Sequence, residues 1–166
     1  MKFIYALSLY IFLNVTTVAM AQEKAAFNAI EEMFATMSAY DYDGMTATGT
    51  DDYNLLEHGE VWTMGDLINA IKGGEGVAER RNYFNVIRSS GDDKSMWFSF
   101  WNRAEIRTTF GEELTLSWLE SAVVINIDGE WKVEMLHSTR LNEDTTIPED
   151  VVMTEYVGEN AFMIED

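Results

Sequence analysis

Residues 114–140 read LTLSWLESAVVINIDGEWKVEMLHSTR, and they carry the strongest signal for a β-hairpin in the sequence. It contains two runs of alternating apolar and polar residues, separated by Asp128-Gly129. An Asp-Gly pair between such runs is typical of a two-residue β-hairpin turn, because both turn positions need a positive φ. The stretch therefore predicts two long antiparallel strands joined by a tight turn.

The predicted turn also determines which side chains of the two strands share a face. Alternate residues of a strand point to the same side of a sheet, and this side is apolar for several steps. We therefore expect it to pack against helices. The predicted cross-strand pairs on this face are Asn126–Trp131, Val124–Val133, Ala122–Met135, Glu120–His137 and Trp118–Thr139.

One predicted pair at the far end of this face consists of two side chains that can exchange protons. Glu120 would lie opposite His137, with the two Cβ atoms roughly 5 Å apart. A carboxylate beside an imidazole raises the pKa of the histidine and orients its ring, as in general bases and ligand-binding histidines. We predict these two residues as the candidate catalytic pair, and the alternative is a structural pair that closes the sheet near its rim.

The preceding strand, predicted over residues 95–109, has one apolar and one mixed face. A two-residue loop at Gly111-Glu112 would turn the face with Arg103 inward, whereas a three-residue loop or a bulge would bury the apolar face. We expect the apolar face inside, because unpaired charges in a core cost several kcal/mol. The outer face would then expose an apolar patch, which favours a homodimer through this face. The patch comprises Trp97, Trp101, Val123, Ile125 and Leu136.

The N-terminal half of the chain has helical spacing instead. Apolar residues recur every three to four positions over residues 23–40, which predicts one long amphipathic helix. Two short strands are expected at 53–57 and 61–62. Thr63 and Asp66 are then typical of the capped start of a second helix.

The order of the predicted elements gives the fold class. Helices come first, and a run of strands follows at 83–89, 95–109, 114–127 and 131–140. This order predicts an α+β fold in which N-terminal helices pack on one face of a curved, mainly antiparallel sheet.

The first 21 residues have the three parts of a secretory signal peptide. Lys2 is followed by an apolar run over 3–13, and Ala19-Met20-Ala21 forms a small-residue cleavage site. The apolar run is short against the roughly twenty residues that span a bilayer. We therefore expect cleavage after Ala21 and a periplasmic or secreted product that does not insert into a membrane. The mature chain would consist of one domain over 22–141 and a tail over 142–166.

The composition excludes several classes of partner and site. The 166 residues include 29 acidic and 11 basic side chains, and the formal net charge of −18 argues against nucleic-acid binding. The absence of cysteine from the sequence excludes disulfides, thiol nucleophiles and thiolate metal sites. His58 and His137 lack metal-binding spacing, so we expect neither a metal nor a cofactor. The acidic tail over 142–166 is predicted either to be solvated or to dock as a strand.

Three segments carry a resemblance to a known family. Residues 51–53 read DDY, residues 57–64 read EHGEVWTM, and residues 128–139 read DGEWKVEMLHST. Together they resemble the SnoaL-like group of the nuclear transport factor 2-like superfamily, including its exported members, over about residues 22–141. The resemblance implies a cone-shaped, cystatin-like roll, with helices inside a strongly bent sheet, a pocket in the mouth of the cone and dimers through the outer face. That superfamily includes isomerases, dehydratases, cyclases and non-catalytic binding proteins, so the fold alone does not decide function.

We therefore predict an exported domain that binds a small apolar or amphipathic molecule in a hydrophobic pocket. One alternative is an isomerase- or dehydratase-like enzyme that uses Glu120 and His137 for proton transfer. A second alternative is a non-catalytic, dimeric interaction domain whose own side chains fill the cavity. The candidate ligand-binding residues are Tyr40, Asp52, Tyr53, Glu57, Trp62, Trp118 and Met135.

Overall fold

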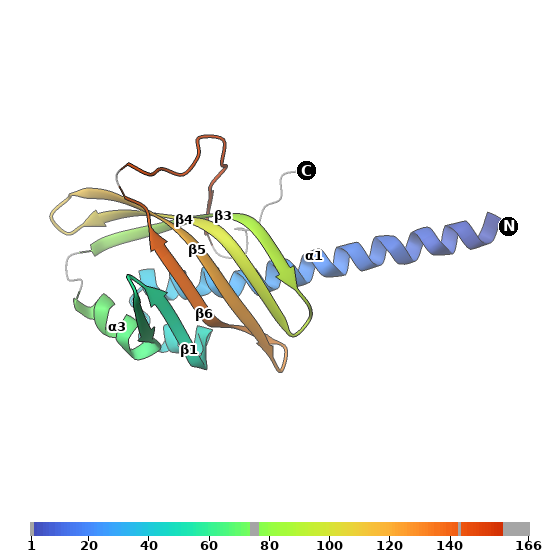
Figure 1. Cartoon of the computed structure of the whole chain (residues 1–166), viewed down its shortest axis with the longest axis horizontal. Coiled ribbons are helices and arrows are strands. Elements are labelled where there is room, and N and C mark those ends of the chain that lie inside the picture. Colours follow the sequence, from blue (N-terminus) through green and yellow to red (C-terminus); the bar gives the residue numbers. More distant parts are fainter. Residues whose placement is uncertain (1, 74–76, 143, 158–166) are drawn as a thin grey trace.

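A computed structural model describes residues 2–73, 77–142 and 144–157 of the chain (Figure 1). It contains helices α1 (Lys2–Ser38), α2 (Tyr42–Thr48) and α3 (Met64–Gly73). The strands are β1 (Gly49–Glu57), β2 (Glu60–Thr63), β3 (Val77–Gly91), β4 (Ser95–Thr108), β5 (Glu113–Ile127), β6 (Glu130–Arg140) and β7 (Thr154–Glu155).

The strands form one seven-stranded sheet in the order β2-β1-β6-β5-β4-β3-β7. All neighbours are antiparallel except β1 and β6, which run parallel. Helix α1 packs across one face of the sheet, and its N-terminal part extends beyond the sheet (Figure 1). The predicted α+β fold, with N-terminal helices on a mainly antiparallel sheet, is confirmed.

An aromatic core joins α1 to the sheet. Phe27 and Phe34 recur on one face of α1, and both are buried. The Phe27 ring contacts the rings of Phe98 and Phe100, with centroids 5.3 and 5.4 Å apart. Burial of one such side chain stabilises a fold by about 1.5–3 kcal/mol, and edge-to-face contacts add to this. Aromatic side chains therefore fill the space between the sheet and the part of α1 that packs on it.

Helix α1 is longer than expected, because it runs without a break from Lys2 instead of starting near residue 23. Residues 2–21 of the predicted leader and the start of the predicted domain thus share one helix. In the described part of the chain, no helix combines the length and the apolar character needed to cross a bilayer. Cleavage after Ala21 stays a prediction.

Both predicted hairpins have the expected turns. Asp128 and Gly129 have φ values of 55° and 95°, as a two-residue turn requires. Between β4 and β5, the Thr108 N–H donates to the Glu112 carbonyl, so three residues form the loop. The apolar face of β4 therefore lies inside, and Phe98 and Phe100 are fully buried, as predicted.

The predicted register fails beyond the first four residue pairs of the β5–β6 hairpin. Val124 pairs with Val133, but Val123 pairs with Met135, so Glu134 is an extra residue in a β-bulge. The Thr50 hydroxyl of β1 donates a hydrogen bond to the Glu134 carboxylate and holds this bulge from the neighbouring strand.

The bulge shifts every later pair by one residue and exchanges the faces of β6. The observed pairs are Ala122–Leu136, Ser121–His137, Glu120–Ser138, Leu119–Thr139 and Trp118–Arg140. Leu136 and Ser138 therefore point into the core, whereas His137 points outward and is exposed. The predicted pairs of Met135, His137 and Thr139 are wrong, and so is the placement of Leu136 on the outer face. The physical gain of the bulge is that it bends the strand and buries Leu136.

Two further expectations can be compared with the structure. At the start of α3, the Thr63 N–H and hydroxyl donate to the Asp66 carboxylate, and the Asp66 N–H donates to the Thr63 hydroxyl. The predicted helix cap is therefore confirmed. The tail docks through β7, which pairs with the edge strand β3, and the Tyr156 hydroxyl donates to Glu32 at 2.5 Å. The tail thus docks as a strand at Thr154–Glu155 alone, while residues 158–166 lie outside the described residues.

Candidate functional site

A group of polar side chains lies on the inner face of the sheet, past the aromatic core. Glu120 of β5 is only 3% exposed and lies between β4 and β6. The Ser138 hydroxyl donates to its Oε1 at 2.6 Å, and the Asn102 side-chain amide donates to its Oε2 at 3.0 Å. Neighbouring strands therefore hold the carboxyl group in one orientation.

The surroundings of Glu120 change its acidity. Burial raises the pKa of its carboxyl group from 4.5 to about 7. The hydrogen bonds from Ser138 and Asn102 and the charge of Arg80 lower the pKa, but by less than burial raises it. A carboxyl group with a pKa near neutrality can either donate or accept a proton under physiological conditions.

Arg80 of β3 brings a positive charge to the same end of the core. Its Nε donates to Asn82 Oδ1 at 3.1 Å, and its Nη1 lies 3.2 Å from the sulfur of Met37. The guanidinium also lies over the rings of Phe34 and Trp118, at 5.9 and 5.8 Å from their centroids. Burial lowers the pKa of Arg80 and the negative charge of Glu120 opposes this, yet an arginine stays protonated in proteins.

Strand β1 adds a buried hydroxyl group to the same region. Tyr53 is 4% exposed, and within the described part of the chain its hydroxyl has no hydrogen-bond partner. Burial raises its pKa, and the negative charges of Glu120 and Glu57 raise it further. We call these side chains the inner polar cluster, which consists of Tyr53, Arg80, Asn102, Glu120 and Ser138.

A cavity of about 170 Å³ reaches the inner polar cluster at Arg80. Its walls are formed by the end of α1, by α3, by the start of β3 and by the end of β4. These walls are mainly apolar. The other lining residues are Met37, Ser38, Tyr40, Ile71, Val77 and Ile106. A second hollow of about 540 Å³, between α1, β3 and β7, is also lined by Arg80 and Ser38. Arg80 is therefore accessible to a small molecule from two hollows.

Several predicted site residues meet at this end of the core. Glu120 and Tyr53 belong to the inner polar cluster, and Trp118 packs beside the Arg80 guanidinium. Glu57 is half-buried, and its charge acts on Glu120. Tyr40 lines the smaller cavity, and its hydroxyl donates to the Val77 carbonyl at 3.4 Å.

The other predicted site residues lie elsewhere. His137 and Met135 are on the outer face, because the bulge turns them away from the core. Asp52 is exposed on β1. Trp62 packs against the core, but its indole N–H donates to Glu60 at 2.8 Å. The predicted catalytic pair Glu120–His137 therefore does not exist.

Three residues of the site were missed in the sequence. Ser138 was assigned to the wrong face, because the alternation was continued past Met135-Leu136, where the bulge shifts it by one residue. Asn102 interrupts the apolar face of β4, and a buried amide within an apolar run was a usable signal. Arg80 lies before the predicted start of the strand at residue 83, so it was not placed on the inner face.

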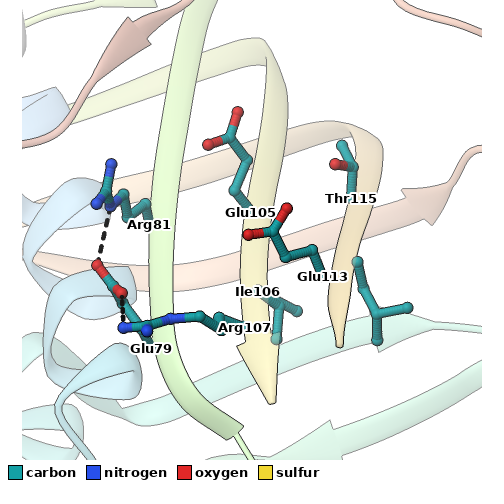
Figure 2. A pocket seen from close by; sticks show the side chains of 8 residues that line it. Glu79, Arg81, Glu105, Ile106, Arg107, Glu113 and Thr115 are labelled. Atoms are coloured by element: carbon teal, nitrogen blue, oxygen red, sulfur yellow. Dashed lines mark hydrogen bonds and ion pairs between the residues drawn. The ribbon is translucent and has the colours of Figure 1, made fainter. Parts of the chain in front are cut away.

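A larger hollow of about 670 Å³ lies on the outer face, at the ends of β3, β4 and β5 (Figure 2). Figure 2 shows Glu79 between Arg81 and Arg107, which donate to it at 3.0 and 2.6 Å. Because these charges neutralise one another and are exposed, they provide little binding energy for a ligand. No group of three or more histidine, aspartate or glutamate side chains in the described ranges could hold a metal ion.

Comparisons with solved structures identify the fold. A protein named as a scytalone dehydratase from Novosphingobium aromaticivorans superimposes with a TM-score of 0.64 and 13% identity, over 80% of this chain and 93% of that chain. A ketosteroid isomerase-like protein from Erwinia carotovora atroseptica gives a TM-score of 0.57 and 14% identity, over 71% and 95%. An uncharacterised protein with a cystatin-like fold from Caulobacter vibrioides gives 0.57 and 13%, over 75% and 92%.

No family model and no curated protein sequence matches the chain. The structural likenesses nevertheless confirm the cystatin-like fold that the resemblance to nuclear transport factor 2-like proteins implied. At these identities they show the fold alone. The activity has to be argued from the residues of the site.

Proposed function

We propose that the protein binds a small, largely apolar molecule whose polar group reaches the inner polar cluster. One observation supports this proposal above the others. The Tyr53 hydroxyl and Asn102 Oδ1 are buried and have no hydrogen-bond partner among the described residues. Buried polar atoms are nearly always paired in folded proteins, since an unpaired one costs about 1–3 kcal/mol. A bound molecule with a polar group would supply the missing partners.

The walls of the site favour the same class of molecule. The cavity beside Arg80 is lined mainly by apolar side chains such as those of Met37, Ile71 and Ile106. Ligand sites typically combine apolar walls with a few polar groups that fix the orientation of the ligand. Methionine adapts to ligands of different shape, which suits an apolar group of no fixed outline.

The experiment compares molecules that co-purify with the wild type and with a variant whose cavity is filled. Ile106→Trp adds an indole to the cavity wall, whereas the control Ile87→Trp adds one at a side chain that is 49% exposed. Native mass spectrometry should detect a bound small molecule on the wild type and on Ile87→Trp, and little on Ile106→Trp. Equal occupancy in all three proteins would show that the molecule does not bind in this cavity.

A proton-transfer enzyme is a second candidate, because the pKa of Glu120 is raised to about 7. Structural neighbours named for a ketosteroid isomerase and a scytalone dehydratase fit this class of reaction. In this candidate Glu120 acts as the general base without a histidine, and the Tyr53 hydroxyl stabilises the developing oxyanion. Exchange of the α-hydrogens of cyclopentanone in deuterated water should then be faster with the wild type than with Glu120→Gln. Equal rates would exclude this role for Glu120.

We also propose that the protein is exported, as the signal-peptide pattern of residues 1–21 indicates.

We further propose that the protein forms a homodimer through the outer face of the sheet. On that face Trp97 and Leu119 are 37% and 39% exposed. The patch is smaller than expected, because Leu136 lies in the core. Leu119→Glu should give a monomer in sedimentation experiments, whereas Val61→Glu on the edge strand β2 should leave the dimer intact. A wild-type monomer at all concentrations would contradict the dimer.

A further inference from the structure

We infer that the ligand of this site is a small organic carboxylate, whose anionic group is bound by the guanidinium of Arg80. The inference rests on the proposed function, because it specifies which polar group the bound molecule carries.

Arg80 lacks the direct ion pair with a carboxylate that Arg81, Arg103 and Arg107 have. Arg81 and Arg107 each have a Glu79 oxygen within 3.0 Å, and Arg103 has a Glu105 oxygen at 3.4 Å. Across the described ranges, no carboxylate oxygen lies within 4.0 Å of the Arg80 guanidinium. Arg88 and Arg140 also lack such a contact among the described residues, but they are exposed to solvent, whereas Arg80 is half-buried. A partly buried cation without a paired anion is costly, and an anionic ligand would remove that cost.

The guanidinium also keeps donors for a ligand. An arginine has five N–H donors in a planar fork that matches a carboxylate. The Nε donor binds Asn82, and the partner of Nη1 is the thioether of Met37, which is a weak acceptor. Among the residues that the structure describes, neither terminal nitrogen of Arg80 donates to an oxygen atom. The fork is therefore open to a carboxylate.

The orientation of the guanidinium is fixed before a ligand binds. The rings of Phe34 and Trp118 lie 5.9 and 5.8 Å from it, and Asn82 holds Nε. Contacts between a cation and aromatic faces stabilise the charge without occupying its donors in the guanidinium plane. A site that is ordered in advance loses less entropy when a ligand binds.

The cavity limits the size of the apolar part of the ligand. Its volume of about 170 Å³ is close to the roughly 150 Å³ that accommodates one benzene ring in a protein core. Benzoate is therefore a suitable probe, and benzamide is its neutral counterpart with nearly the same shape.

Glu120 makes the binding of an anion depend on pH. The groups that face it are Tyr53 and Glu57 from β1, Arg80 from β3, Asn102 from β4 and Ser138 from β6. When Glu120 is ionised, its charge competes with a ligand for Arg80. When Glu120 is protonated, this competition ends. The affinity for benzoate should therefore fall as the pH rises through the pKa of Glu120, which is about 7.

Calorimetric titration with benzoate and benzamide tests the inference. The wild type should bind benzoate at least tenfold more tightly than benzamide, which corresponds to about 1.4 kcal/mol. Arg80→Gln should abolish this preference, and Arg80→Lys should keep part of it. The control Arg88→Gln removes an exposed arginine of the same strand and should keep all of it.

The outcomes separate this inference from the proposed function. Equal binding of benzoate and benzamide, with both lost in Ile106→Trp, would overturn the carboxylate and leave the small-molecule site standing. Binding of neither probe would also overturn the carboxylate, and the co-purification experiment with Ile106→Trp would then decide on the proposed function. If Arg80→Gln does not fold, the pH dependence decides. The preference for benzoate should weaken between pH 6 and pH 8 in the wild type but not in Glu120→Gln, and the same pH profile in both proteins would overturn the inference.

Discussion

Replacing Glu120 by glutamine should stabilise the folded protein against unfolding, and this gain over the wild type should be larger at alkaline pH than at acidic pH. The carboxyl group is 3% exposed, and burial raises its pKa from 4.5 to about 7. Between these two values the folded state holds a proton that the unfolded state has lost. The free energy of unfolding of the wild type therefore falls as the pH rises through this window, and it stays low above it.

The size of the effect follows from the same two pKa values. Each tenfold change in proton affinity corresponds to about 1.4 kcal/mol, so the raised pKa of Glu120 costs the folded wild type about 3 kcal/mol above pH 7. Glutamine cannot ionise and does not bear this cost. It keeps the hydrogen bond from Ser138, and a rotation of the Asn102 amide by half a turn brings Oδ1 in place of Nδ2 to accept a hydrogen bond from the new amide.

Urea unfolding of both proteins at a series of pH values measures the difference directly. The stability of Glu120→Gln minus that of the wild type should increase by about 3 kcal/mol between pH 4 and pH 8. Other buried acids titrate in both proteins, so their contributions cancel in this difference. Glu130→Gln removes an exposed carboxylate and controls for the loss of one negative charge. A difference that does not change with pH would show that Glu120 has the same pKa in the folded protein as in the unfolded chain.

Three further predictions concern single contacts. Ser138→Ala removes a hydrogen bond that lowers the pKa of Glu120, so a carbon NMR titration should place that pKa above 7, and a lower value would contradict the assigned contact. Glu31 is 2% exposed and burial raises its pKa to about 8, so Glu31→Gln should gain about 3–5 kcal/mol of stability between pH 4 and pH 9, measured by urea unfolding. An unchanged pH dependence would show that Glu31 ionises freely. Thr63→Ala removes the two hydroxyl hydrogen bonds with Asp66 that cap α3 and should cost about 1 kcal/mol in thermal unfolding, and no loss would mean that these bonds are dispensable.

The fold could be predicted because its signals are local. The Asp128-Gly129 turn, the alternating runs beside it and the helical spacing before it each depend on residues close together in the chain. The choice of the buried face of β4 was also right, because the cost of burying Arg103 outweighed the simpler loop.

The site was harder to predict because it depends on the register of strands that are far apart in the chain. A single extra residue at Glu134 moved His137 out and Ser138 in, and so replaced an imidazole by a hydroxyl beside Glu120. The adjacent pair Met135-Leu136 breaks the alternation and was the one local sign of this change. The position of Arg80 followed only from the real start of β3 at Val77.

The most direct test of a ligand site inside the sheet uses the tryptophan indole N–H signals in NMR spectra. Trp118 lies beside Arg80 at the inner polar cluster, whereas Trp97 is on the outer face and 37% exposed. On titration with benzoate, the signal of Trp118 should shift and saturate, and that of Trp97 should stay in place. A saturating shift of Trp97 with no change at Trp118 would place the ligand on the outer face and contradict the account.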